Sequence, residues 1–180
     1  RQLANAGADL LGDGGFDLGA RTHQVRDDLT ALGAKTDVKK AYAITLDDRA
    51  VFLTAWHERA IAALDAKAVD GHPKRIEALK LLKDSWSGRA SVDSVGYRIT
   101  RAYMYALHDF LFESANEEMA RIDAKANMAS VTSRWPVVLA RLLDRQPAGW
   151  LPPQYANWQA LQLAALDRAI GSLTKDGQPL

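Results

Sequence analysis

Asp47 and Asp48 are adjacent carboxylates, and a pair of carboxylates can act as general acid and general base. On a helix, however, neighbouring residues point about 100° apart, so their side chains rarely converge on one substrate. We therefore interpret the pair as charges at a helix start, where they favour the exposed backbone amides, or as ion-pair partners of a nearby arginine. No catalytic role is predicted for either aspartate.

The histidines offer no recognisable metal site. No two of them have the i, i+4 spacing that places two ligands on one helical face; they are His23, His57, His72 and His108. His57 and His108 fall near helical surfaces and are interpreted as ordinary surface or capping histidines. The chain has no cysteine, which excludes disulfides, thiol catalysis and thiolate metal sites. We therefore predict no metal site in this chain.

Ser91 and Ser94 lie close to Asp93, a grouping that could include a serine nucleophile. An elbow-type serine hydrolase places its serine in a Gly-x-Ser-x-Gly turn and pairs it with a histidine. Neither feature accompanies Ser91 or Ser94. We therefore predict no catalytic residue within these 180 residues.

Residues 1–19 are predicted to be a Gly-rich connecting segment. Gly12, Gly14, Gly15 and Gly19 make a loop more favourable than a helix. A Gly-rich loop cradles phosphate when it follows a strand and opens a helix, and no strand-like run precedes this one. A plain connection is the favoured interpretation.

The composition excludes several partners. Lys and Arg total 23 against 22 Asp and Glu, and a net charge of +1 argues against a polybasic surface for nucleic acid or membrane. No apolar run is long enough to span a bilayer. No signal peptide is visible, and the chain begins at Arg1, so we expect that an upstream part has been removed.

Apolar residues recur at three- and four-residue spacing through most of the chain, which predicts helices. The predicted helices cover residues 20–32, 37–44, 46–67, 73–83, 92–114, 116–126, 135–143 and 157–173. No segment alternates at period two for long enough to be a strand, and no repeat recurs at a fixed period. The sequence thus predicts an all-α fold, an irregular antiparallel helical bundle over residues 20–174, with a tail at 175–180.

Several helix ends have specific signals. Gly33 is expected to stop the first helix, and Thr36 or Asp37 to cap the second. Ser91 or Asp93 is expected to cap the helix that begins near residue 92. Asn116, which two glutamates follow, indicates a new helix start, so we predict a break there.

Trp56 and Ile99 lie at the centres of two predicted apolar stripes. Large apolar side chains at such positions are normally buried. Both are therefore predicted to be core residues, and the tryptophans in general are interpreted as packing anchors.

Two runs resemble a known family. Residues 44–56 read ITLDDRAVFLTAW and residues 86–102 read WSGRASVDSVGYRITRA. Both resemble the large subunit of the penicillin amidase (penicillin acylase) family of N-terminal-nucleophile hydrolases. The resemblance extends from Asp17 to about Leu173.

The resemblance implies that this chain is part of a larger enzyme whose catalytic groups lie elsewhere. In the family, precursor cleavage makes a serine the first residue of the large subunit, and its own α-amine serves as base. That serine, the oxyanion-hole asparagine and the calcium ligands of the family would all lie outside this chain. The chain would be the helical knob of a large subunit, inactive alone, in a periplasmic enzyme. Its partners would be the small subunit and the catalytic sheet layers, and the parent would cleave a penicillin side chain, an acyl homoserine lactone or a related acyl amide.

Arg21, in GARTHQVRDDL, is the one position that the resemblance marks for the substrate site. The family has an arginine near its nucleophile at the start of a helix, and Arg21 occupies the matching place. A surface or ion-paired arginine is the alternative interpretation.

A different class of function is also compatible with the sequence. The chain could be a stand-alone helical interaction or scaffold module with no enzymatic parent. An exposed apolar patch used for docking would support that alternative.

Overall fold

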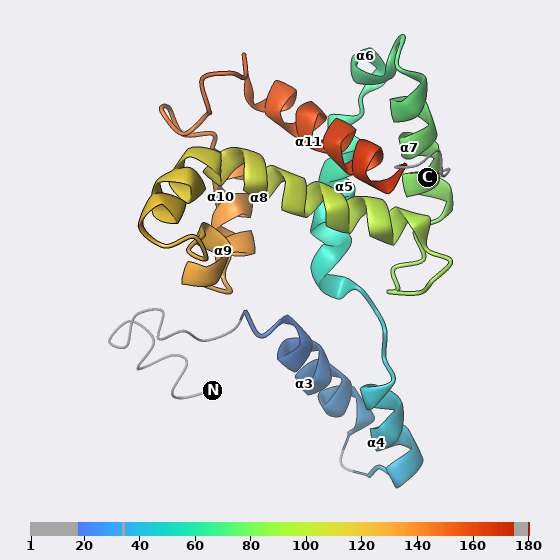
Figure 1. Ribbon diagram of the computed structural model, residues 1–180. Coiled ribbons are helices and arrows are strands. Elements are labelled where there is room, and N and C mark those ends of the chain that lie inside the picture. The colour runs from blue at the N-terminus through green and yellow to red at the C-terminus, as the bar shows by residue number, and fades with distance from the viewer. Residues whose placement is uncertain (1–17, 34, 175–179) are drawn as a thin grey trace.

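The computed structural model describes residues 18–33, 35–174 and 180, and this part of the chain is α-helical without a β-strand (Figure 1). The all-α prediction is confirmed. Most of the predicted connecting segment and of the predicted tail lies outside the described residues. In chain order the helices are α3 (Ala20–Leu32), α4 (Val38–Thr45), the 3₁₀ turn η1 (Val51–Leu53), α5 (Thr54–Ala63), α6 (Ala66–Val69), α7 (Pro73–Asp84), α8 (Val95–Ile122), α9 (Met128–Val131), α10 (Trp135–Arg145) and α11 (Trp158–Leu173).

Helix α8 is the centre of the bundle. It crosses the middle of the larger part of the molecule and packs against α5, α7, α10 and α11 (Figure 1). Its buried stripe includes Ile99, Tyr103 and Leu107, all fully buried. The Tyr103 hydroxyl donates a 3.1 Å hydrogen bond to Oε1 of Gln162 on α11, and burial raises the pKa of that hydroxyl above its usual value. The partner on α11 satisfies a polar group that would be costly to bury alone.

The remaining core comes from the apolar faces of the surrounding helices. Trp56 on α5 is 4% exposed, and Ile99 is fully buried. The prediction that both side chains are buried in the core is confirmed. Other fully buried side chains are Leu82, Leu139, Leu143, Leu161 and Leu166.

Four helix boundaries have recognisable local signals, and those at Asp37 and Gly33 were expected. The Asp37 carboxylate accepts a hydrogen bond from the Lys40 amide, and the Asn157 side chain does the same for Ala160, each at 2.8 Å. Gly33 ends α3 with a φ of 73°, a left-handed conformation that favours glycine. Pro136 lies in the first turn of α10, where its missing backbone N–H leaves no helical hydrogen bond unmade.

The prediction of one continuous helix over residues 46–67 is wrong, although Thr54–Ala63 within it is helical. Leu46 is 64% exposed. Residues 47–50 are not helical, and Arg49 forms an isolated antiparallel β-bridge with Arg89 before η1 and α5 begin. There the Ala90 amide donates to the Asp48 carbonyl at 2.8 Å, and the Ala50 amide donates to a carbonyl of the same facing loop. These pairings occupy backbone groups that a helix would need, and they override the helical period of the side chains.

The predicted break at Asn116 is also wrong, because α8 continues to Ile122. The Asn116 side chain instead accepts a 2.8 Å hydrogen bond from the Met128 amide, at the start of α9. It therefore stabilises the returning chain and starts no helix of its own. At the other end, α8 begins at Val95 after Ser94, later than predicted and without the expected side-chain cap from Ser91 or Asp93.

The connection between α7 and α8 approaches α8 very closely at Gly96. A Cβ built at Gly96 would lie 3.1 Å from the Trp86 backbone nitrogen and 3.2 Å from its Cα. The Gly96 amide donates to Ser85 Oγ at 2.8 Å, and Ser94 Oγ donates to the Ser85 carbonyl at 2.9 Å. Two backbones thus meet where only a glycine fits without displacement.

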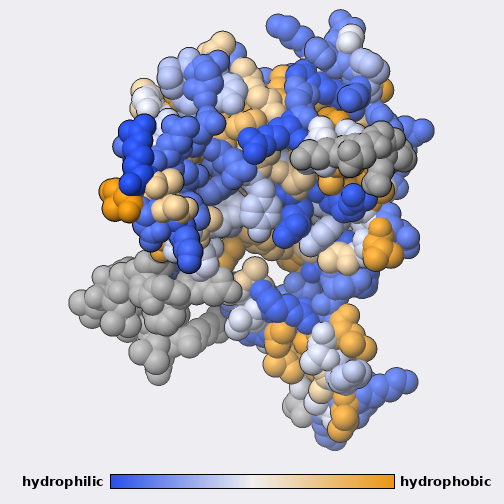
Figure 2. All heavy atoms as spheres, viewed as in Figure 1, coloured by the Kyte–Doolittle hydropathy of each residue, from blue (hydrophilic) through white to orange (hydrophobic). Residues whose placement is uncertain are grey.

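Helices α3 and α4 form an arm that lies apart from the other helices (Figure 1). Helix α3 has no buried residue, and Ile44 is the buried residue of α4. Figure 2 shows hydrophobic residues at the surface of the arm. The exposed large side chains of α3 and α4 include Leu29, Val38, which is 86% exposed, and Tyr42. The arm therefore buries little apolar surface of its own.

Candidate functional site

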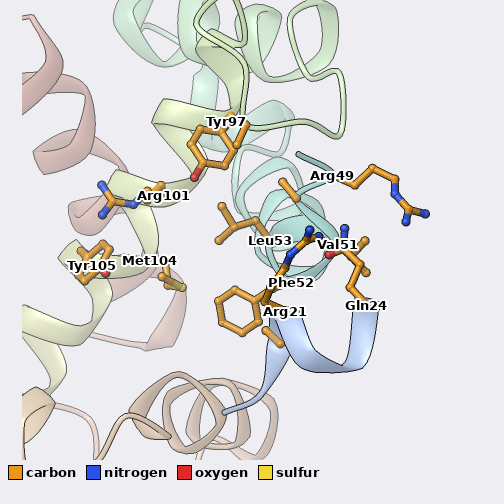
Figure 3. A pocket seen from close by; sticks show the side chains of 13 residues that line it. Arg21, Gln24, Arg49, Val51, Phe52, Leu53, Tyr97, Arg101, Met104 and Tyr105 are labelled. Atoms are coloured by element: carbon orange, nitrogen blue, oxygen red, sulfur yellow. The ribbon is translucent and has the colours of Figure 1, made fainter. Parts of the chain in front are cut away.

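A cavity of about 330 Å³ lies where the arm meets the bundle (Figure 3). Its walls come from the start of α3, from residues 49–53 and from one face of α8. The residues that define it are Ala20, Arg21, Gln24, Arg49, Ala50, Val51, Phe52, Leu53, Ala90, Tyr97, Arg101, Met104 and Tyr105. It combines polar residues from the arm with aromatic and aliphatic residues from the bundle.

The polar wall is organised around Asp47. Arg49 donates from Nε to Asp47 Oδ1 at 2.9 Å and from Nη2 to Asp47 Oδ2 at 2.8 Å, a bidentate pair. Arg49 also pairs with Asp28 of α3, and the Gln24 side chain donates to Asp47. The hydrogen bonds from Arg49 hold the pKa of the Asp47 carboxyl well below its usual range, and the same bonds raise the pKa of Arg49. Both groups therefore stay charged, and Asp47 is unsuited to act as a base near neutral pH.

Arg21 lies in the cavity wall, where Nη1 is 3.4 Å from Asp47 Oδ2 and Nη2 donates to the Ile44 carbonyl. The guanidinium thus links the start of α3 to the end of α4. This position is compatible with a structural role and with a role beside a substrate, so the substrate-binding role of Arg21 stays a prediction.

The carboxylates of Asp47 and Asp48 pair with different arginines. Asp48 pairs with Arg89, whereas Asp47 pairs with Arg21 and Arg49. The interpretation as helix-start charges is wrong, because neither lies in a helix, and the interpretation as ion-pair partners is confirmed. The two carboxylates form no acid–base pair.

The apolar wall faces the arm from the other side. Phe52 and Leu53 of η1 and Met104 of α8 line the cavity on this side. The Arg101 guanidinium lies over the Tyr105 ring at 5.1 Å, at the rim opposite Arg21 (Figure 3).

The two helical histidines are buried, which corrects the expectation of surface or capping residues. The His57 ring stacks on Trp86 with centroids 4.2 Å apart, and its Nε2 lies 2.9 Å from the Leu82 carbonyl. His108 packs against Trp135 at 4.5 Å. Their helices turn these rings toward aromatic partners that are distant in sequence, so the helical period alone could not place them.

The serines considered for catalysis have other environments. Ser94 Oγ donates to the Ser85 carbonyl, and the hydrogen bond of His57 goes to Leu82. Within residues 18–33, 35–174 and 180, no group of three acidic or histidine side chains is placed to hold a metal ion. None of the helices in that part of the chain is long and apolar enough to cross a membrane.

The two sequence runs that carry the family resemblance meet at this cavity. Residues 49–53 belong to the first run, and Ala90, Tyr97 and Arg101 belong to the second. The family model described as penicillin amidase matches residues 3–179, nearly the whole chain. This chain belongs to the penicillin amidase family. That family consists of hydrolases that act on amides.

No curated protein and no solved structure matches this penicillin amidase chain. The family assignment therefore stands on the family model, which covers more of the chain than the two runs alone.

Sequence reasoning missed most of the residues that line the cavity. Of the lining side chains, it marked Arg21 alone as a binding residue, although Arg49, Phe52, Tyr97 and Arg101 lie in the two runs. The available signal was that these four residues lie in the two runs that resemble the family. The pairing of residues 48–50 with 88–90, which brings the runs together, has no short-range sequence signature.

The attachment of the arm should depend on pH through Asp47. Because the folded pKa of Asp47 is lowered, its contribution to stability is present above the usual aspartate pKa of about 3.9 and is lost as the pH falls toward the folded value. Asp47→Asn should remove this dependence and speed amide hydrogen exchange in α3 about 10-fold at neutral pH.

Hydrogen exchange followed by mass spectrometry on α3 peptides measures this effect. Asp84→Asn is the matched control, since Asp84 is exposed at the end of α7, away from the arm. Equal α3 exchange in the two variants would show that the Asp47 contacts do not hold the arm.

Proposed function

We propose that this chain is a helical section of the large subunit of a penicillin amidase-like enzyme and has no catalytic activity alone. The parent enzyme would cleave the C–N bond of a linear amide: a penicillin side chain, an acyl homoserine lactone or a related acyl amide. The observation that carries the proposal is the meeting of two family-like runs at one cavity, in a chain that the family model matches over residues 3–179.

The chemistry would be supplied outside this chain. An N-terminal serine hydroxyl would attack the amide carbonyl, forming a C–O bond, while the α-amine accepts the hydroxyl proton. As the C–N bond breaks, that proton passes to the leaving amine, and water then hydrolyses the acyl ester. The small subunit and the catalytic sheet layers would be the partners of this chain, in the periplasm, and any calcium would bind elsewhere in the parent.

Within this scheme the chain would form one wall of the substrate site. Arg21 would act as a fixed positive charge, because Asp47 and the Ile44 carbonyl already orient its guanidinium. Such preorganised charge lowers the cost of developing negative charge in a low-dielectric site.

The decisive experiment compares Arg21→Ala with Arg26→Ala in the complete enzyme. Arg26 is the matched control, since it is exposed on the same helix and pairs with its neighbour Asp27. We expect Arg21→Ala to lower kcat/KM for a chromogenic phenylacetyl amide about 100-fold, and Arg26→Ala to leave it near the wild-type value. Near-wild-type rates for both would remove Arg21 from the site.

The purified 180-residue chain should hydrolyse no amide, while the complete enzyme does. Hydrolysis by the chain itself would contradict the assignment of catalysis to another part of the protein.

A second candidate function is a helical docking module with no enzymatic parent. The exposed apolar side chains of the arm, such as Val38 and Tyr42, favour a partner surface. A neighbouring domain of the parent enzyme would cover the same side chains, so the patch fits both proposals. The open reading frame upstream separates them, because the first requires a serine at a processing junction and an asparagine segment before residue 1.

A further inference from the structure

A second cavity lies next to the candidate site, on the side of α10. Its volume is about 490 Å³, and its walls come from α3, from η1 and from the first turn of α10. We call it the α10 groove and define it by its apolar residues, Leu18, Val51, Phe52 and Val137. The groove and the first cavity share one wall, so a surface that covers one of them reaches the other. The residues common to both are Ala20, Gln24, Arg49, Val51 and Phe52.

The apolar side chains of the α10 groove are open to solvent in this chain. Val51, Phe52 and Val137 all belong to the exposed large hydrophobic residues. They come from two helical segments that are distant in sequence, and they face one concave surface. Exposed apolar side chains that gather in this way, with polar residues at the edge, are typical of a surface that binds another protein surface.

One edge of the α10 groove is acidic, because Asp27 and Asp28 line it from α3. Asp28 pairs with Arg49 through Oδ1, while its Oδ2 is buried and accepts no hydrogen bond from residues 18–33, 35–174 or 180. A buried acceptor without a donor is costly. The complementary surface is therefore apolar and brings a hydrogen-bond donor to this edge.

The candidate site indicates which surface covers the α10 groove. In the proposed function this chain supplies Arg21 at the first cavity, and the serine nucleophile comes from another part of the parent enzyme. The part that brings the serine close to Arg21 has to lie against the first cavity. The shared wall at Val51 and Phe52 then carries that contact into the groove.

We propose that the α10 groove is the docking surface for the part of the parent enzyme that carries the nucleophile, and that apolar side chains of that part fill the groove. The inference rests on the proposed function, since it takes the first cavity to be part of the substrate site. It adds a defined contact surface, with Val137 at its centre, that binds no substrate.

The test compares amide hydrogen exchange in the complete enzyme and in the separate 180-residue chain. Peptides that cover η1 and the first turn of α10 report on the groove. We expect their exchange to be about 10-fold slower in the complete enzyme, because docking excludes water and restrains both segments.

Val137→Asp is the diagnostic variant, and Val138→Asp is its matched control. The two valines are adjacent in the first turn of α10 and are 46% and 43% exposed, but Val138 does not line the groove. In the complete enzyme, Val137→Asp should raise the exchange of these peptides about 10-fold, because docking would bury an unpaired carboxylate. Val138→Asp should change it less than about 2-fold, as expected of a surface substitution. Val137→Ile keeps an apolar side chain and should keep the slow exchange.

The separate chain controls for misfolding. Both valines are exposed there, so neither aspartate variant should change the midpoint of its chemical denaturation. Self-association of the separate chain that Val137→Asp abolishes, measured by sedimentation, would overturn the proposal, because a second copy would then be the occupant of the groove.

The remaining outcomes separate this inference from the proposed function. Equal exchange of the groove peptides in the separate chain and in an enzyme that hydrolyses amides would overturn the docking surface and leave the proposed function standing. Equal effects of Val137→Asp and Val138→Asp in the complete enzyme would overturn it as well. No hydrolysis of any amide by the complete enzyme would refute the proposed function, and with it this inference.

Discussion

Replacing Trp56 by alanine is expected to lower the free energy of unfolding by about 3–5 kcal/mol, the range for truncation of a large buried aromatic side chain. Trp56 is 4% exposed on α5 and belongs to the core that α5 shares with α8 and α11. Its removal would leave a cavity that the surrounding helices can fill only in part. Equilibrium denaturation monitored by circular dichroism measures the loss.

Trp150→Ala is the control for this prediction. Trp150 is 51% exposed in the loop before α11, so its truncation should change the free energy of unfolding by less than about 0.5 kcal/mol. Losses of similar size in the two variants would mean that burial of Trp56 does not determine the stability of the bundle.

Replacing Ile99 by alanine should cost about 2–5 kcal/mol, because Ile99 is fully buried where α8 faces the other helices. Ile122→Ala, at the other end of the same helix, removes the same atoms from a side chain that is 91% exposed. Both variants replace isoleucine by alanine in the same helix, so the difference between their free energies of unfolding reports the loss of packing and not the change in helix propensity. A loss under about 0.5 kcal/mol for Ile99→Ala would contradict the assignment of the α8 core face.

The helical period in the sequence predicted most of the fold because most helices bury one face against α8. The helices at 135–145 and 158–173 have apolar side chains at helical spacing, and Pro136 and Asn157 mark their starts. These signals act within a few residues. The failures occurred where a distant segment competes with local preference. Residues 47–50 leave the helix to pair with residues 88–90, and Asn116 caps a segment that starts at Met128.

The candidate site was harder to predict for the same reason. Arg21 could be marked from a family-like pattern, but its contacts with Ile44 and Asp47 join residues more than 20 positions apart. The burial of His57 depends on the packing of the 85–94 connection, because Trp86 covers its ring. A single sequence contains the residues of such contacts but not the distances between them.

The close approach at Gly96 has a consequence for recombination between related proteins. Trp86 and Gly96 share one steric constraint, since a Cβ at residue 96 would lie 3.1 Å from the Trp86 backbone nitrogen, so one of the two segments would have to shift by a few tenths of an ångström. A chimera that takes the α7–α8 connection from one parent and α8 from another would have to satisfy this constraint with residues that were not selected together. The natural unit of exchange is therefore the whole segment from residue 85 to residue 96, a crossover boundary defined by backbone contact and not by helix ends.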